Sequence, residues 1–195
     1  MPTTSPVIVW FRQDLRIHDN PALAYAAKTK SPLIFLYILD EQTKPWQLGQ
    51  ASRWWLHHSL KALNETLCKK YNTSLILKKG SPLAILQSLI KTTNAKAVFW
   101  NRCYEPHFIA RDKEIKTLLQ KHHIEVHSFN GALLKEPWEC LNQSKLPFKV
   151  FTPFWKNLQK QRYSRSDGPG VLCAMPSRMC TKHWQNFMCM ALRKS

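Results

Sequence analysis

The stretch Val9–Leu23, with the sequence VWFRQDLRIHDNPAL, decides how this chain folds. Its start belongs to an apolar run, Val7–Phe11, and continuous hydrophobicity of this length is typical of a strand buried on both faces. Two arginines, two aspartates and an asparagine then fall within nine positions. Asp19 or Asn20 is placed to N-cap a helix that has Pro21 in its first turn. A strand, a charged loop and a helix in this order predict the first βα unit of an α/β domain.

The charged loop lies where such folds bind ligands, because ligands of open α/β sheets sit beyond the carboxyl ends of the strands. Arg12 and Arg16 carry planar donor groups that suit carboxylates or other anions. Their partners are either Asp14 and Asp19 within the loop or an anionic ligand. The sequence alone leaves both interpretations open.

Further strand and helix patterns alternate along the chain as far as residue 129. The expected strands are 7–11, 33–39, 75–77, 97–100 and 124–129, and the expected helices are 21–28, 51–71, 82–93 and 108–122. This alternation predicts a Rossmann-like or flavodoxin-like α/β fold, with a five-stranded parallel sheet, helices on both faces and a crevice at the switch point.

Several common cofactor and catalytic sites are excluded, because the sequence lacks their motifs. No G-x-G-x-x-G follows the first strand, and no P-loop, G-x-S-x-G elbow or H-E-x-x-H helix is present. The histidine pairs at 57–58 and 122–123 are adjacent in sequence, so we expect no metal site. The six cysteines form no C-x-x-C pair, which favours free thiols in the cytoplasm. No apolar run is long enough to cross a membrane, and the N-terminus has no leader pattern.

The composition is strongly basic, with a net charge of +17 from 29 Lys and Arg against 12 Asp and Glu. Such a charge attracts polyanions and nucleic acid in particular. The lysines are scattered rather than clustered, so we expect at most weak, non-specific contact with DNA.

The pattern changes after the last expected strand. We expect an α/β domain over residues 1–132 and a connection over 133–161, in which Thr152 N-caps a new helix with Pro153 in its first turn. The segment 162–195 contains three of the six cysteines and four of the five methionines. It has no sustained helical period, so we expect an atypical tail that is frameshifted or disordered.

Four separated stretches resemble the DNA photolyase and cryptochrome family. They are VWFRQDLRIHDNPAL at 9–23, GQASRWWLHHSL at 49–60, NRCYEP at 101–106 followed by ARD at 110–112, and LPFKVFTPFW at 146–155. The resemblance implies an N-terminal α/β domain that holds a light-harvesting antenna chromophore. It also implies a helical C-terminal domain that binds FAD and damaged DNA, where the excited flavin splits pyrimidine dimers.

The FAD-binding helices of that family have no counterpart after residue 161. We therefore assign no catalytic residue and no FAD ligand, and we expect this chain by itself to be inactive in repair. The exposed interdomain surface is a candidate contact for a homo-oligomer.

The resemblance places candidate chromophore contacts around the strand ends. They are Trp10, Phe11, Arg12, Asp14, Arg16, Leu39, Asp40, Arg53, Asn101, Tyr104 and Glu105. Folate-binding members place an Asn-Glu pair where this chain has His107 and Phe108, so we expect a deazaflavin or a flavin, or an empty pocket, rather than a folate.

Each candidate also has a structural interpretation. The two aromatic candidates fit the core of the first strand. Arg53 fits an ion pair with Asp40 or Glu41, and Tyr104 and Glu105 fit a turn before the next proline. The leading hypothesis is the light-harvesting domain of a DNA-repair photolyase. The alternatives are a fragment of a cryptochrome-type blue-light sensor and a non-catalytic nucleotide-binding or interaction module.

Overall fold

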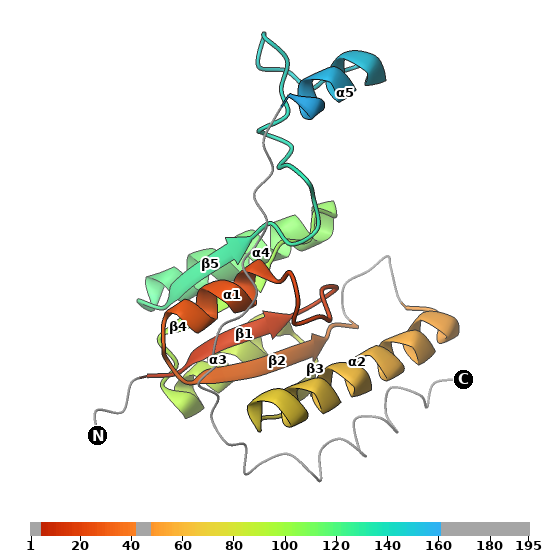
Figure 1. The fold of residues 1–195 in the computed structure, drawn as a ribbon. Coiled ribbons are helices and arrows are strands. Elements are labelled where there is room, and N and C mark those ends of the chain that lie inside the picture. The colour runs from red at the N-terminus through yellow and green to blue at the C-terminus, as the bar shows by residue number, and fades with distance from the viewer. Residues whose placement is uncertain (1–4, 42–47, 161–195) are drawn as a thin grey trace.

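A computed structural model describes residues 5–41 and 48–160 of the chain. The strands are β1 (Val7–Phe11), β2 (Leu33–Leu39), β3 (Ile76–Lys79), β4 (Ala97–Asn101) and β5 (Glu125–Phe129), and the helices are α1 (Pro21–Lys28), α2 (Gln50–Tyr71), α3 (Pro82–Thr93), α4 (Pro106–Lys121) and α5 (Phe151–Gln159) (Figure 1). Strands and helices alternate up to β5, as the hydrophobic pattern predicted.

The five strands form one parallel sheet in the order β3-β2-β1-β4-β5. β1 lies at its centre, where Trp10 is the register neighbour of both Leu36 and Trp100. The chain winds from β1 toward β3 in one direction and resumes at β4 on the other side. This confirms the predicted Rossmann-like α/β fold and puts its switch point between β1 and β4.

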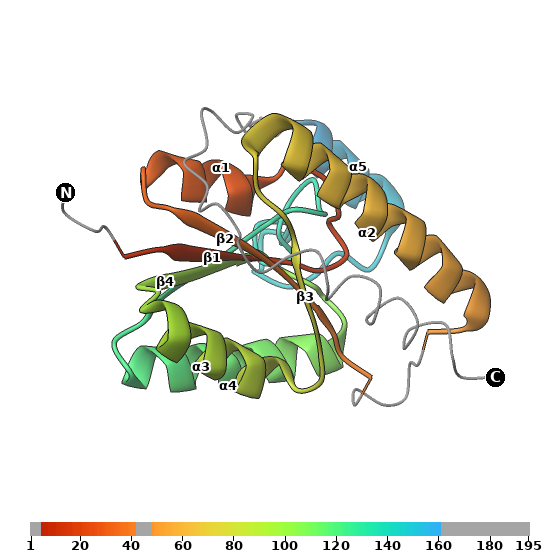
Figure 2. The ribbon, with the colours of Figure 1, turned by 90° about the horizontal axis from the view of Figure 1, so that it is seen from below.

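Helices cover both faces of the sheet, with α1 and α2 on one side and α3 and α4 on the other (Figure 2). Side chains alternate along β1, so that Val9 and Phe11 join the core under α1 and α2, while Ile8 and Trp10 join the core under α3 and α4. All five residues of β1 are buried, which explains why its sequence is apolar without alternation.

One capping prediction is wrong. Helix α5 begins at Phe151 with Val150 in the N-cap position, so Thr152 lies inside the helix instead of capping it. Pro153 still falls in the first turn of α5. A missing N–H costs no hydrogen bond anywhere in that turn, so the proline does not have to be the first helical residue. By contrast, Asn20 caps α1 as expected, because its side chain accepts a hydrogen bond from Leu23 N.

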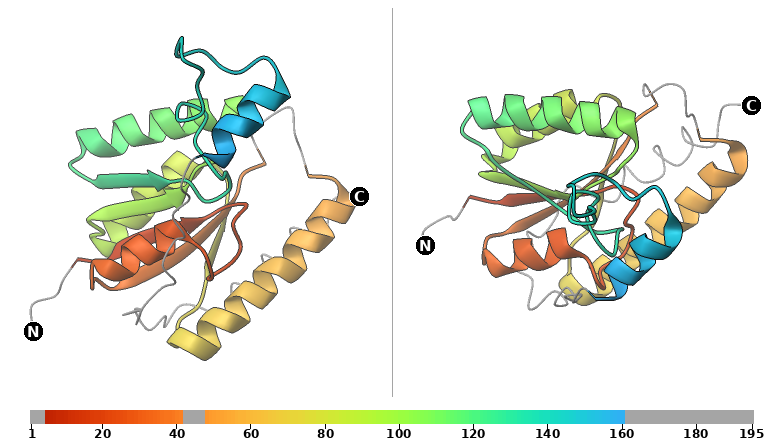
Figure 3. Two further views of the ribbon diagram at one scale, coloured as in Figure 1. Left: turned by 45° about the horizontal axis from the view of Figure 1, so that its top comes forward. Right: turned by 90° about the horizontal axis from the view of Figure 1, so that it is seen from above.

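Between β5 and α5 the described chain has no helix or strand, and its only bridge pairs Leu141 with Pro147. This stretch leads away from the sheet to α5, which stands apart from the five strands (Figures 1 and 3). The predicted atypical tail, 162–195, lies outside the described residues. Within the described ranges, no helix is long and apolar enough to cross a membrane.

Candidate functional site

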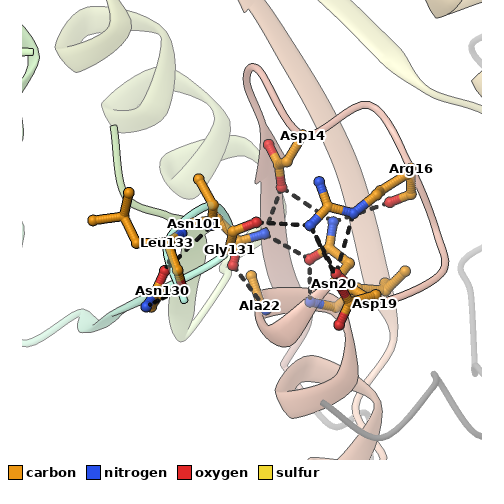
Figure 4. A network of polar contacts seen from close by, with 11 residues as sticks. Asp14, Arg16, Asp19, Asn20, Ala22, Asn101, Asn130, Gly131 and Leu133 are labelled. Carbon is orange, nitrogen blue, oxygen red and sulfur yellow. Dashed lines mark hydrogen bonds and ion pairs between the residues drawn. The ribbon is translucent and has the colours of Figure 1, made fainter. Parts of the chain in front are cut away.

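A buried polar network joins the carboxyl ends of β1 and β4 at the switch point (Figure 4). The Asn101 side-chain nitrogen donates to Asp14 Oδ2 at 2.5 Å and to Asn20 Oδ1 at 2.8 Å. Asn20 in turn donates to Asp14 Oδ2 at 3.1 Å, and Asn101 Oδ1 accepts from the backbone N–H of Ala22 at 3.1 Å. The structure thus places Asp14 and Asn101 in a network that holds the loop and the start of α1 against β4.

The two loop arginines have different partners. Arg12 is buried, and its guanidinium forms an ion pair with Asp112 of α4 at 2.6 Å and donates to the backbone oxygen of Asn101. An Arg12–Asp14 ion pair was one expectation and is wrong, because Asp14 Oδ1 accepts from the backbone N–H of Arg12 instead. The Asp14 carboxylate thus holds the backbone of the loop, and the Arg12 guanidinium is left to pair with a residue of α4.

Arg16 is half-exposed and bridges two parts of the chain. Its guanidinium donates to the backbone oxygens of Asp19 at 3.0 Å and of Gly131 at 2.7 Å (Figure 4). The Arg16–Asp19 ion pair that the sequence allowed is present at 3.9 Å, on the surface. Arg16 therefore connects the loop between β1 and α1, residues 12–20 (the β1 loop), to the segment that follows β5.

The carboxylates after β2 are also paired. Asp40 accepts from Arg111 of α4 at 3.1 Å. Of the two partners considered for Arg53, the structure selects Glu41 at 2.9 Å, and Glu41 also binds Lys79 at 2.8 Å. The hydrogen bond from Lys79, together with that from Arg53, outweighs burial and lowers the pKa of Glu41.

Beyond β4, Tyr104 faces the segment after β5, because its hydroxyl donates to Glu136 Oε1 at 3.0 Å. Burial, followed by this contact with a carboxylate, raises the pKa of Tyr104 to about 12. Glu105 is the N-cap residue of α4 without a side-chain capping bond, and it accepts from Gln13 at 3.0 Å.

Arg102, which is partly exposed, and the buried Glu136 form an ion pair that sequence reasoning did not select. Arg102 also donates to Ser128 Oγ at 3.0 Å and lies over the Trp138 ring at 5.6 Å. The sequence shows only two glutamates, Glu136 and Glu139, in a lysine-containing connection, and this signal is too weak to identify a pair 34 residues apart.

A cavity of about 690 Å³ lies beside this network, between the β1 loop, β2 and α2. It is lined by Arg12, Gln13, Leu15, Arg16, Tyr37, Leu48, Ala51, Ser52, Trp55, Leu56 and Ser59. Of the residues that the sequence predicted to contact a chromophore, only Arg12 and Arg16 line this cavity. Trp10, Phe11 and Leu39 are core residues.

The lining residues that we did not select come mainly from β2 and the first turns of α2. Trp55 lies off the buried face of α2, which is formed by Leu60, Leu63 and Leu67, and its ring is exposed. An exposed tryptophan in the stretch GQASRWWLHHSL is the signal that could have identified it, since large exposed aromatic side chains often mark binding surfaces.

The chemistry of the lining suits a planar, neutral or anionic ligand. Leu15, Tyr37, Trp55 and Leu56 supply apolar and aromatic surface, and the lining includes arginine but no carboxylate. Burial raises the pKa of Tyr37 well above its usual range, so this phenol stays neutral. The volume falls within the roughly 300–1,000 Å³ of small-molecule sites.

The model of the DNA photolyase family matches residues 7–170. The chain belongs to the DNA photolyase family. A deoxyribodipyrimidine photo-lyase of Agrobacterium fabrum is 43% identical over 173 residues, which cover 88% of this chain and 36% of the relative. Cryptochrome-1 of Arabidopsis thaliana is 40% identical over 158 residues, which cover 80% of this chain and 23% of the relative.

The solved structure of a class III photolyase from Agrobacterium tumefaciens superposes on this chain with a TM-score of 0.84 and 41% identity. The superposition covers 94% of this chain and 38% of the photolyase. The chain therefore corresponds to the N-terminal domain of DNA photolyases and spans about a quarter to two fifths of their length. This confirms the family resemblance. Proteins of the family bind a flavin and a second chromophore.

Proposed function

We propose that this chain supplies the light-harvesting domain of a photolyase that repairs pyrimidine dimers in DNA. The observation that carries the proposal is the cavity at the carboxyl edge of the sheet, bounded by the β1 loop and α2. Both segments belong to the stretches that resemble the family. The second chromophore of the family would bind here and pass its excitation to the flavin of the whole protein.

The start of α2 supports an anionic group on the chromophore. This helix has 22 residues, and Gly49 occupies its N-cap position without a side-chain capping bond. Ala51 and Ser52, in the first turn, line the cavity. The free N–H groups and the positive end of the helix dipole face such a site, and Arg16 adds a formal charge.

The position of Phe108 supports a deazaflavin or a flavin over a folate. The family resemblance implies a glutamate here in folate-binding members, whereas Phe108 lies 4.6 Å from the Arg111 guanidinium. Its ring is committed to a cation–π contact and provides no hydrogen bond for a pterin.

Equilibrium binding of flavin mononucleotide, a deazaflavin and a reduced folate to the purified chain tests this proposal. We expect the first two to bind and Trp55→Ala to weaken their binding about tenfold, equivalent to roughly 1.4 kcal/mol. Trp138→Ala is the matched control, because Trp138 is similarly exposed and is not among the cavity-lining residues. Equal binding by both variants would contradict the site.

Arg53→Ala probes the same site through its support. Arg53 Nε donates to Leu48 O at 2.9 Å, and the guanidinium pairs with Glu41, so its removal frees the residues at the start of α2. We expect an intact fold and weaker retention of the chromophore. Retention equal to that of the parent chain would refute a role for Arg53.

DNA is the proposed partner of the whole protein, since the family acts on damaged DNA. For this chain we propose only weak, non-specific attraction through its net charge of +17. Affinity for undamaged duplex should fall steeply between low and physiological salt. Affinity that does not change with salt would contradict an electrostatic origin.

A second candidate function is blue-light sensing, which the 40% identity to a plant cryptochrome favours. Light-dependent rescue of UV-irradiated, repair-deficient cells by the whole protein, in which this domain is joined to a flavin-binding domain, would support the repair function. Failure to rescue, together with a chromophore-bearing protein, would support the sensor.

A further inference from the structure

Two tryptophans on neighbouring strands form a close pair in the core. Trp10 of β1 and Trp100 of β4 are register neighbours, and their ring centroids lie 5.6 Å apart at an interplanar angle of 67°. Both are buried, with exposed fractions of 2% and 0%. Both belong to the core under α3 and α4.

Charged groups from the β1 loop and from α4 contact the Trp10 ring and restrict its orientation. The guanidinium carbons of Arg12 and Arg111 lie 5.1 Å and 5.2 Å from the Trp10 centroid. Asp112 forms ion pairs with both arginines. A ring packed on all sides and fixed by paired cations has little freedom to reorient.

The environment of the pair differs from that of the other described tryptophans. Neither indole N–H has a hydrogen-bond partner within the described residues. The remaining described tryptophans, Trp54, Trp55, Trp138 and Trp155, are 45% to 69% exposed. An indole that is shielded from water emits at shorter wavelength than a hydrated one, so emission from the buried pair is spectrally separable.

We propose that Trp10 and Trp100 form an electronically coupled pair that absorbs ultraviolet light and passes the excitation to a chromophore in the neighbouring cavity. The step is dipole–dipole energy transfer, in which no bond changes and no electron or proton moves. It would extend the light collected by this domain to wavelengths that its chromophore absorbs weakly. The acceptor rests on the function proposed above, whereas the coupling of the two indoles does not.

The distance favours transfer. Arg12 contacts the Trp10 ring and also lines the cavity, so one residue connects the pair to the site. Pair and cavity lie on opposite faces of the sheet, and layers in such folds pack roughly 10 Å apart. Dipole–dipole energy transfer from indole remains efficient over that separation. The rate of electron transfer from indole to a flavin falls exponentially with distance, so the separation favours energy transfer over quenching.

Circular dichroism tests the coupling without any ligand. Two coupled indoles give a paired positive and negative band, so Trp100→Phe and Trp10→Phe should each remove the whole couplet. Trp138→Phe should retain it. Each variant must show cooperative thermal unfolding, and the two core variants check each other. A couplet that survives both core substitutions, or its absence from the parent chain, overturns the proposal.

Sensitised emission tests the transfer, with flavin mononucleotide as the probe. All variants carry Trp55→Phe, which removes the donor that lines the cavity and keeps an aromatic ring there. Their emission is compared at flavin concentrations that saturate each variant. Flavin emission under indole excitation should fall at least twofold in Trp100→Phe and stay unchanged in Trp138→Phe. An equal signal in both refutes transfer from the pair. If flavin mononucleotide does not bind the parent chain, the flavin site and the transfer to it are both refuted, while the couplet still decides the coupling.

Discussion

Arg12 and Asp112, separated by 100 positions in the sequence, form a buried ion pair at 2.6 Å that connects the end of β1 to α4. The same carboxylate pairs with Arg111 at 3.1 Å, and Arg111 reaches Asp40 after β2. Asp112 and Arg111 thus link the carboxyl ends of β1 and β2 to α4. The β1 loop acquires its shape from this link and from the Asn101 network.

Asp112→Asn should destabilise the domain, because the buried Arg12 loses its carboxylate partner and Arg111 keeps only Asp40. Removing one partner of a buried pair typically costs about 3 kcal/mol, and urea unfolding of the purified chain measures it. The matched control is Asp19→Asn, which alters the exposed pair with Arg16 and should change stability by less than about 0.5 kcal/mol. Similar losses in the two variants would contradict a special role for the buried pair.

Gly131→Ala should destabilise the switch-point network. A Cβ at this position would lie 2.7 Å from Cβ and Cγ of Asn101, whose side chain is held by Asp14 and Asn20 and cannot yield. Overpacking of this kind costs about 1–3 kcal/mol. Gly49→Ala is the control, since its added methyl meets no atom within 4 Å. If the two glycine-to-alanine variants shift the unfolding midpoint equally, then close packing against Asn101 does not require a glycine at position 131.

The Glu41 ion pairs should make stability depend on acidity. Because the folded pKa of Glu41 is lowered from its ordinary value of 4.5, its contribution is fully present above about that pH and is lost as pH falls through the folded pKa. Melting temperatures of the parent chain and Glu41→Gln should differ near neutrality and converge in acid. The exposed Glu65→Gln should follow the parent throughout. Parallel curves for the parent and Glu41→Gln would rule out this linkage.

Glu136→Gln should loosen the segment after β5 without unfolding the sheet. Glu136 is 5% exposed, and its carboxylate accepts from both Arg102 and Tyr104. We expect faster amide exchange over residues 133–139 and a lower pKa for Tyr104, which spectroscopic titration follows. Glu114→Gln, an exposed change on α4, should leave both unchanged. Unaltered exchange in Glu136→Gln would show that the ion pair does not hold the segment.

The positions of the helices and strands could be predicted because each element carries its own pattern. Continuous apolar runs marked β1, β2 and β4. The spacing of Leu56, Leu60, Leu63 and Leu67 predicted the buried face of α2, and all but the partly buried Leu56 are buried. The errors lie at element ends, as with Thr152, where neighbouring residues compete for the cap. Hydrogen bonding and burial repeat along an element, so a local stretch of sequence is sufficient to reveal it.

The candidate site was predicted only in outline. The motifs directed attention to the strand ends, yet Asp14, Asn101 and Asp40 are satisfied by protein partners, and the cavity takes Trp55 and Tyr37 instead. A charged residue in a motif looks the same whether it binds a ligand or another side chain. Its role depends on which groups surround it after folding.

By itself, the sequence determined the family, the order of the elements and the parallel α/β class, because periodicity, capping residues and motif spacing are local properties. Only the tertiary structure decided that Arg12 pairs with Asp112, that Trp10 meets Trp100, and that a cavity opens beside α2. These contacts join residues about ninety to a hundred positions apart or depend on how strands and helices pack. Their partners are chosen by strand order and burial, and neither can be read from neighbouring residues along the chain.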